Sequence, residues 1–172
     1  VKKIAILSTR TIQEKQLDFV TKTDPKKLSA EMKAMGMTMM KQIVNEKGAY
    51  VVQQGKTKKI EGTDLAEMQA SATTFEELQL SKKSGLVVSG IESINGNDAY
   101  AILNGKSTLY YDIKSGLKVS EAKTMEQGGK KMTQITNYGD YREVKGVKIP
   151  FNIIQNVGFE LDIKMSEVKI NE

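Results

Sequence analysis

Ser115 and Ser120 are each followed three residues later by a lysine, which is the spacing of a nucleophilic serine and its activating base. The pairs are Ser115 with Lys118 and Ser120 with Lys123. Such a serine works when the start of a helix holds it against a desolvated lysine. These pairs fall in a predicted turn and a predicted strand, where we expect surface serines and hydrated lysines. The spacing therefore does not favour catalysis.

The other chemical groups argue in the same direction. The 172 residues contain no His and no Cys, so the commonest general base, the thiolate nucleophile and the two commonest zinc ligands are missing. The Asn95-Gly-Asn-Asp98 segment offers oxygen ligands but lacks the loop length and distal Glu of a calcium loop. Adjacent Glu76 and Glu77 would point to opposite faces of a strand. We predict a protein that is not an enzyme and that has no metal site and no cofactor.

Composition narrows the class of protein further. The charge balance of 26 basic and 21 acidic residues gives +5, but the lysines come in ones and twos, usually near acids. This pattern is typical of a solvated surface. The aromatic residues, at 6%, are mostly placed where strands would bury them, so we expect no nucleic-acid partner. No run approaches the roughly 20 apolar residues of a membrane span. The length predicts a single domain over residues 1–172.

Alternating apolar and polar residues, punctuated by turn signals, predict a mainly β (α+β) fold with about ten antiparallel strands. Asp24-Pro25, Asn95-Gly-Asn-Asp98, Asn104-Gly105, Lys114-Ser-Gly116 and Gly128-Gly129 are expected turns, with a bend at Gly139-Asp140. The clearest strands are expected at Val1 to Thr9, Thr11 to Thr23, Leu86 to Ile94, Ala99 to Leu103, Ser107 to Ile113, Leu117 to Glu126, Lys130 to Tyr138, Val147 to Asn156 and Phe159 to Ile170.

Two segments need separate treatment. Leu28 to Lys41 has methionines at helical spacing, but Gly36 interrupts it and strand-like residues follow, so we predict two strands hinged near Gly36. The segment from Gly62 to Met68 predicts the best helix, with Thr63 or Asp64 as its N-cap. One further short helix is compatible with the pattern.

Methionines crowd residues 32–40, where five of the nine in the chain lie. Flexible thioether side chains can fill irregular gaps in an ordinary core, and they can also adapt to acyl chains or varied partners. Composition leaves both interpretations open.

The segments Tyr110-Tyr-Asp-Ile-Lys-Ser-Gly-Leu117 and Asp140-Tyr-Arg-Glu-Val-Lys-Gly-Val-Lys-Ile-Pro-Phe151 resemble the outer-membrane lipoprotein-sorting (LolA-like) superfamily. The methionine segment and the helix after Gly62 fit the same group, so the similarity spans nearly the whole chain. More narrowly, the chain is similar to exported domains of Bacteroidetes that are often labelled zinc proteases. The zinc motif behind that label requires two histidines, which this chain lacks, so the label implies no chemistry here.

The resemblance implies a strongly curved, incomplete antiparallel barrel whose concave face is covered by short helices. It further implies an exported protein of the periplasm or cell envelope that shelters a lipid, the acyl chain of a lipoprotein or another hydrophobic ligand. Strand alternation and the helix stripe select the cavity residues, and a register error of one residue would turn a strand's set outward. The candidates are Met32, Met37, Met39, Leu65, Met68, Leu109, Tyr111, Phe151 and Ile153.

A second hypothesis belongs to another functional class. If the protein's own side chains fill the concave face, the domain would instead be an interaction domain that holds a partner, for example an insulinase-like peptidase domain or another envelope protein. An open apolar pocket favours the first hypothesis, and a solidly packed interior favours the second.

Overall fold

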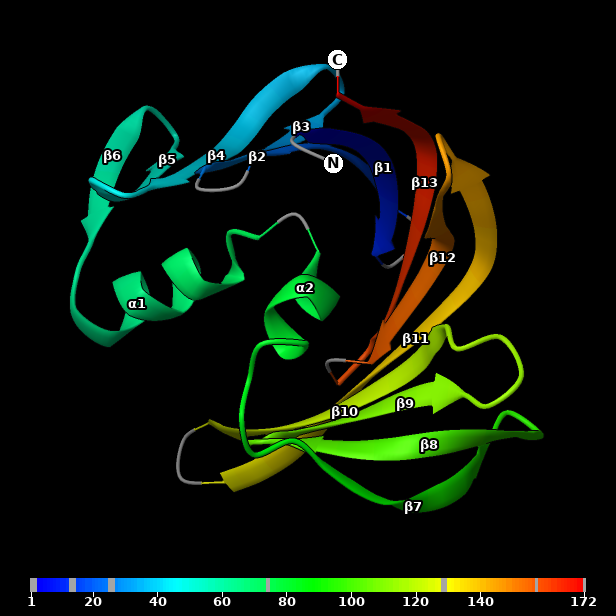
Figure 1. Ribbon diagram of the computed structural model, residues 1–172. Helices are drawn as coiled ribbons and strands as arrows, with labels where there is room; N and C mark the ends of the chain where they lie inside the picture. Colours follow the sequence, from blue (N-terminus) through cyan, green and yellow to red (C-terminus); the bar gives the residue numbers. More distant parts are fainter. Residues whose placement is uncertain are drawn as a thin grey trace.

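The computed structural model describes residues 3–12, 15–24, 27–73, 75–127, 130–156 and 158–171. A single antiparallel sheet dominates it, and two short helices lie inside the curve of that sheet (Figure 1). The strands are β1 (Ile4–Ile12), β2 (Lys15–Asp24), β3 (Lys27–Ala34), β4 (Met37–Asn45), β5 (Gly48–Gln53), β6 (Lys56–Ile60), β7 (Val87–Ile94), β8 (Asn97–Asn104), β9 (Ser107–Asp112), β10 (Lys118–Gln127), β11 (Lys130–Val144), β12 (Val147–Asn156) and β13 (Glu160–Ile170). The helices are α1 (Gly62–Ser71) and α2 (Glu76–Leu80).

The strand order explains the shape. Strands β1 to β6 form one meander, and β7 to β13 form a second, with both helices in the connection between them. The last strand pairs with the first, placing Ile170 opposite Ile4 and joining the two meanders into one sheet of 13 strands. Strands β6 and β7 are the outermost strands of this sheet, so the barrel is incomplete (Figure 1). The predicted mainly antiparallel, curved, incomplete barrel is confirmed.

The sheet has two distinct faces, and the buried residues identify the inner one. Ile4, Ile149, Phe151 and Ile170 form one buried cluster, against which Phe75 of the connection before α2 packs. Val44 and Ala49 form a second cluster with Ala72, just after α1. We call the face with these clusters the inner face and the opposite one the outer face. Alternation along each strand then assigns the remaining side chains.

Helix α1 closes one part of the inner face. Its Leu65 and Met68 pack against Val44 and Ala49, which are 1% and 0% exposed. The helix begins after Glu61 with no side-chain cap, so the predicted caps Thr63 and Asp64 are wrong. Gly62 has a φ of +66°, and this backbone geometry lets the chain turn directly into the helix. No helix among the described residues has the length and apolarity that crossing a membrane requires.

Several sequence predictions need correction. Among the described residues the structure has 13 strands and not about ten. One strand without a prediction is the Lys-rich segment Lys56–Ile60, which pairs with β5 although it holds one apolar residue. Glu76 and Glu77 lie in helix α2 and not in a strand. Strand β11 continues through the expected bend at Gly139-Asp140, where Asp140 alone takes a φ of +50°. The two strands expected on either side of Gly36 are confirmed as β3 and β4.

The remaining turn predictions fare differently. The turns at Asn95-Gly96 and Asn104-Gly105 connect β7 to β8 and β8 to β9, as expected. The break expected near Arg10 is wrong, because β1 and β2 stay paired as far as Ile12 and Lys15. Val1, Pro25 and the Gly128-Gly129 turn lie outside the described residues.

Candidate functional site

A pocket of about 580 Å³ lies between the sheet and helix α2 on the inner face. Its walls come from β1 and β13, which pair although they lie at opposite ends of the chain, from β9 to β12, and from the connection before α2. Its apolar lining includes Ile6 of β1, Phe75, Val147 of β12 and Met165 of β13. We call it the inner pocket. Ligand-binding pockets in proteins commonly have this size and this mainly apolar lining.

A smaller apolar pocket of about 240 Å³ adjoins the inner pocket. It lies between α2 and strands β8 and β9, and Leu80, Leu86, Ile102 and Leu109 line it. Tyr111 and Glu77 line both pockets, so the two spaces meet beside α2. Helix α2 has five residues, and α1 has ten.

One wall of the inner pocket is polar. The Lys118 ammonium lies 3.6 Å from Glu121 Oε2 and 4.7 Å from the centre of the Tyr138 ring. The Tyr138 hydroxyl donates to the same Glu121 oxygen, and the Tyr141 hydroxyl donates to the backbone carbonyl of Lys118 at 2.6 Å. Lys118 is only 9% exposed. These groups satisfy one another, so this wall fixes the geometry of the pocket without presenting a free charge to it.

The environment of Tyr141 agrees with a sheltered pocket. Burial, helped by the negative charge of Glu77, raises the pKa of Tyr141 to about 12, and nearby Lys118 opposes the shift. A phenol that stays neutral across the physiological range acts here as a hydrogen-bond donor. It is not an activated acid or base.

A second cation lies on the inner face at the far end of β1. The guanidinium carbon of Arg10 lies 3.9 Å from the centre of the Phe19 ring, and register places Arg10 between Leu17 of β2 and Ile163 of β13. Its Nε atom is buried and has no hydrogen-bond partner. Burial lowers the pKa of the guanidinium, which still keeps its proton at neutral pH. The guanidinium therefore keeps an unsatisfied buried donor at this end of the inner face.

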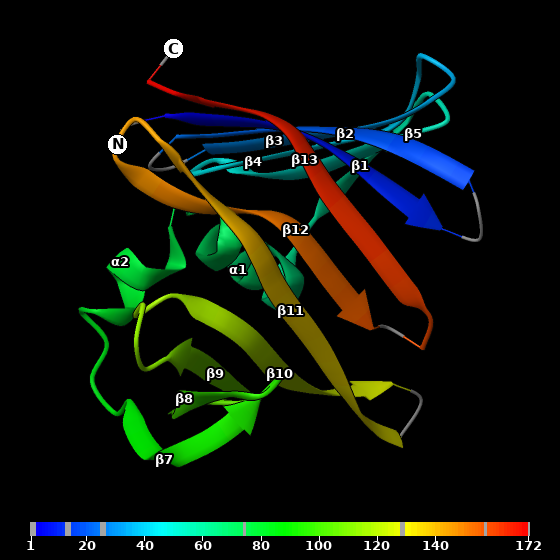
Figure 2. The same cartoon turned by 90° about the vertical axis from the view of Figure 1, so that its right-hand side faces the viewer.

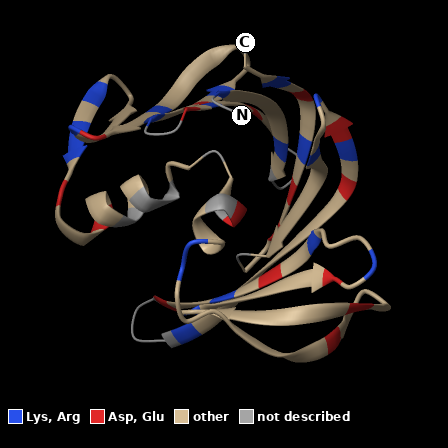
Figure 3. Ribbon diagram, in the orientation of Figure 1, with Lys and Arg blue, Asp and Glu red and all other residues tan. Residues whose placement is uncertain are grey.

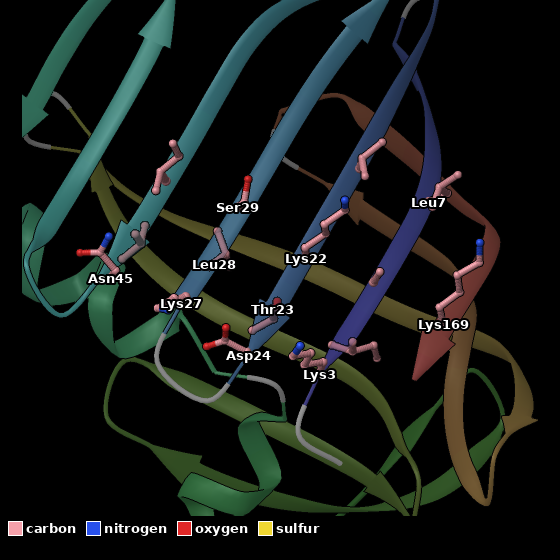
Figure 4. Close-up of a pocket in the computed structure, with 15 residues that line it drawn as sticks. Lys3, Leu7, Lys22, Thr23, Asp24, Lys27, Leu28, Ser29, Asn45 and Lys169 are labelled. Carbon is pink, nitrogen blue, oxygen red and sulfur yellow. The ribbon is translucent and has the colours of Figure 1, made fainter. Parts of the chain in front are cut away.

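A larger pocket, of about 680 Å³, lies on the outer face of β1 to β4 (Figure 4). Leu7, Val20 and Ile43 form its apolar floor, because each alternates with an inner-face residue. Polar and charged residues also line it, namely Lys3, Lys22, Lys27, Lys169, Asp24 and Asn45. We take the inner pocket as the candidate site for an apolar ligand, because four lysines line the outer pocket and both helices cover the inner face.

The structure brings some of the predicted cavity residues together. Leu109 and Tyr111 line the pockets beside α2. Phe151 belongs to the buried cluster of β12, where the Arg142 guanidinium stacks on its ring at 4.5 Å. Ile153 lies on the same face of β12, opposite Tyr138 and Ile163. Their roles toward a ligand stay predictions.

The remaining predicted residues, like Phe151 and Ile153, do not line the inner pocket. Leu65 and Met68 pack under α1. Met32 pairs with Phe19 and Met40, which places it on the inner face near Arg10. Met37 and Met39 are 65% and 41% exposed near the end of the β3–β4 hairpin, where a bulge interrupts the pairing.

Sequence reasoning missed the residues that shape the inner pocket. Ile6, Phe75, Val147 and Met165 were not among the predicted cavity residues. The alternation of Leu161, Ile163 and Met165 carried a signal for an inner face of β13. No local signal could place that strand against β1, because the pairing joins opposite ends of the chain.

The serine and lysine pairs show no catalytic geometry among the described residues. Ser115 Oγ donates to Asp112 Oδ1 at 2.7 Å, and Ser120 Oγ donates to Asn137 Oδ1 at 2.9 Å. The expectation that both pairs are hydrated surface residues is wrong for Ser120 and Lys118, which are 3% and 9% exposed. Within the described part of the chain no group of three or more acidic residues is placed to hold a metal ion.

Comparisons with known proteins agree on the fold. No family model and no curated protein matches the chain. A LolA superfamily protein from Nitrosomonas europaea superimposes with a TM-score of 0.65 at 10% identity, covering 99% of this chain and 86% of that one. A DUF1329 family protein from Desulfovibrio piger gives 0.69 at 11% identity, covering 99% and 85%. The chain therefore has the LolA-like fold that the resemblance implied. Neither structure bears on the label of zinc protease.

Proposed function

We propose that this LolA-like domain is a non-catalytic binding module that holds a lipid, the acyl chain of a lipoprotein or another hydrophobic ligand on the inner face of its sheet. The observation that carries the proposal is the open inner pocket beside α2, with its apolar walls of Ile6, Phe75 and Met165. Apolar ligand surface that leaves water there would contribute about 25 cal/mol per Å² to binding. No covalent step is needed.

Arg10 refines the class of ligand. Its guanidinium lies on the same face as the inner pocket, with a buried Nε that lacks an acceptor. An amphiphile with an apolar chain and an oxygen-rich head group would satisfy that donor and would also fill apolar space. We therefore favour such an amphiphile over a plain hydrocarbon.

The second hypothesis, an interaction domain with a self-filled interior, accounts for one part of the molecule. Helix α1 packs Leu65 and Met68 onto Val44 and Ala49, which fills the inner face at β4 and β5. It does not account for the space beside α2. A location in the periplasm or cell envelope, and an acylated protein as cargo or partner, belong to the proposal and rest on the fold likeness alone.

Native mass spectrometry of protein purified from its own host, followed by lipid extraction, tests the proposal. A bound amphiphile that is lost when the inner pocket is altered would support it. An apo mass together with failure to take up a fluorescent fatty acid would reject the carrier function and favour the interaction domain.

A further inference from the structure

Among the described residues, the most exposed large apolar side chain is that of Met35, at the tip of the β3–β4 hairpin. It is 95% exposed, and Met37 and Met39 beside it are 65% and 41% exposed. Figure 2 shows this light-blue turn at the edge of the molecule, next to the turn between β5 and β6. A side chain as exposed as Met35 adds almost nothing to the folded state through burial, and its grouping with the exposed Met37 and Met39 at one tip calls for another reason.

Turn geometry does not supply that reason. Met35 and Gly36 take φ values of +50° and +78°, the arrangement of a tight hairpin turn that favours Asn or Gly at its first position. Three other turns of the chain share this geometry, and their first residues are the polar Gln54, Asn95 and Lys145. Met35 is the apolar exception among the four. It occupies a position where asparagine would fit the backbone better.

The tip belongs to the positively charged half of the molecule. Residues 1–60, which include β1 to β6, hold 13 Lys and Arg but only 5 Asp and Glu, a net charge of +8. Residues 61–172 hold 13 Lys and Arg and 16 Asp and Glu, a net charge of −3. Figure 3 shows several of the basic segments on β6, at the free edge of this half. The overall value of +5 conceals this division.

The charges closest to the tip are mixed, with lysine in excess. Lys41 and Lys33 both pair with Glu31, at 2.9 Å and 3.9 Å, on the outer face behind the tip. Asp18 of β2 pairs with Lys33 of β3. The exposed Lys56 begins β6, directly after the turn between β5 and β6. Farther along the outer face, Lys3, Lys22 and Lys27 surround the outer pocket (Figure 4).

We propose that the β3–β4 tip docks this protein on an anionic lipid bilayer, with Met35 and Met37 entering the head-group region and the lysines of β1 to β6 attracted to the lipid charges. Apolar side chains flanked by lysines are the pattern of peripheral membrane binding. Flexible methionines suit an irregular lipid surface because they adapt to it. This inference goes beyond the proposed function, since it concerns where the protein rests and not what it holds.

The test measures co-sedimentation of the whole chain with vesicles of about one third phosphatidylglycerol in phosphatidylcholine, and with pure phosphatidylcholine. We expect binding to the anionic vesicles and weak binding to the neutral ones. We expect Met35→Asn to weaken binding about tenfold, because partial burial of one Met side chain in lipid is lost. This substitution places the residue that the turn prefers, so the fold should survive, and circular dichroism checks it.

Two matched variants make the result specific. Asn95→Met places a methionine at the same position of an equivalent turn in the acidic half, and it should not strengthen binding. Ile6→Thr alters the inner pocket, and it should leave vesicle binding unchanged even if it abolishes ligand uptake, which separates this inference from the proposed function. Salt at about 1 M, where the Debye length is about 3 Å, should release the protein.

The inference is overturned if Met35→Asn binds anionic vesicles as tightly as the native chain, or if neutral vesicles bind equally well. It also fails if a folded native chain binds neither kind of vesicle, which would leave an acidic protein surface as the occupant of the tip.

Discussion

Neighbouring residues of β1 offer a direct test of which face holds the ligand. Ile6 lines the inner pocket and Leu7 lines the outer pocket, although one peptide bond separates them. Both side chains are partly buried. Replacing each of them by Thr keeps or introduces a β-branched residue that suits a strand, and it removes a similar amount of apolar surface from opposite faces.

The expected effect follows from the environment of Ile6. Full burial of an Ile side chain is worth about 1.5–3 kcal/mol, and part of that burial is already supplied by the cluster around Ile4 and Ile149. In the Ile6→Thr variant, a ligand in the inner pocket would lose the part of this contribution that it supplies itself by covering Ile6. It would also desolvate the new hydroxyl, at a cost of about 1 kcal/mol or more. Together these terms amount to about 2 kcal/mol, which is about a thirtyfold loss of affinity.

Titration with a fluorescent fatty acid measures that loss. We expect Ile6→Thr to weaken binding about thirtyfold and Leu7→Thr to change it by less than about twofold, while both lose comparable stability. Because the chain has no Cys, a single introduced Cys can also carry an environment-sensitive dye. Equal weakening by the two variants, or weakening by Leu7→Thr alone, would show that the inner pocket is not the ligand site.

Three further expectations concern the framework of the pocket. The pKa of Tyr141 is raised to about 12 in the folded protein, so the stability that this shift contributes is complete below pH 10 and is lost as the pH rises toward 12. The loss should be about 1 kcal/mol, because the side chain is partly exposed. Tyr141→Phe should flatten the dependence of unfolding free energy on pH in this range. Leu109→Ala should cost about 3 kcal/mol, because Leu109 is 0% exposed, and calorimetry should show a melting temperature lower by roughly 6–12 °C; a shift of a degree or less would mean that β9 is not packed as described. Lys118→Met should lower the free energy of unfolding, measured by urea denaturation, by about 3 kcal/mol, because Glu121 loses its partner in a buried site. Adding Glu121→Leu should recover most of that loss, and no recovery in the double variant would contradict the pairing.

Local sequence signals predicted the hairpins of the fold well. Dipeptides such as Asn95-Gly96 and Asn104-Gly105 combine turn propensity with flanking alternation, and the structure has a turn at each. Strand β6 was missed because its apolar content is one Ile, and a free edge strand needs lysines more than a hydrophobic face. A second short helix was allowed for but α2 was not located, because five residues give too short a window for helical periodicity.

The candidate site was harder to predict because its walls meet only through long-range pairing. The register of β1 against β13 brings Ile6 and Met165 to one pocket, and neither residue stands out locally. The methionine segment shows the same limit in a different way. Met32 and Met40 pair on the inner face, and a bulge follows them toward the hairpin turn. Met35 lies at the exposed tip of that hairpin, so five similar residues fall into different environments.

Charge gives the sharpest contrast between sequence and structure. Lysines spaced in ones and twos along the chain suggested an evenly solvated surface, and the total of +5 is modest. A meander, however, keeps consecutive residues on neighbouring strands, so the excess of basic residues before Ile60 becomes a charged half of the sheet. Because the field of a surface depends on where charges gather in space and not on their sequence spacing, topology creates the charged half that the composition conceals.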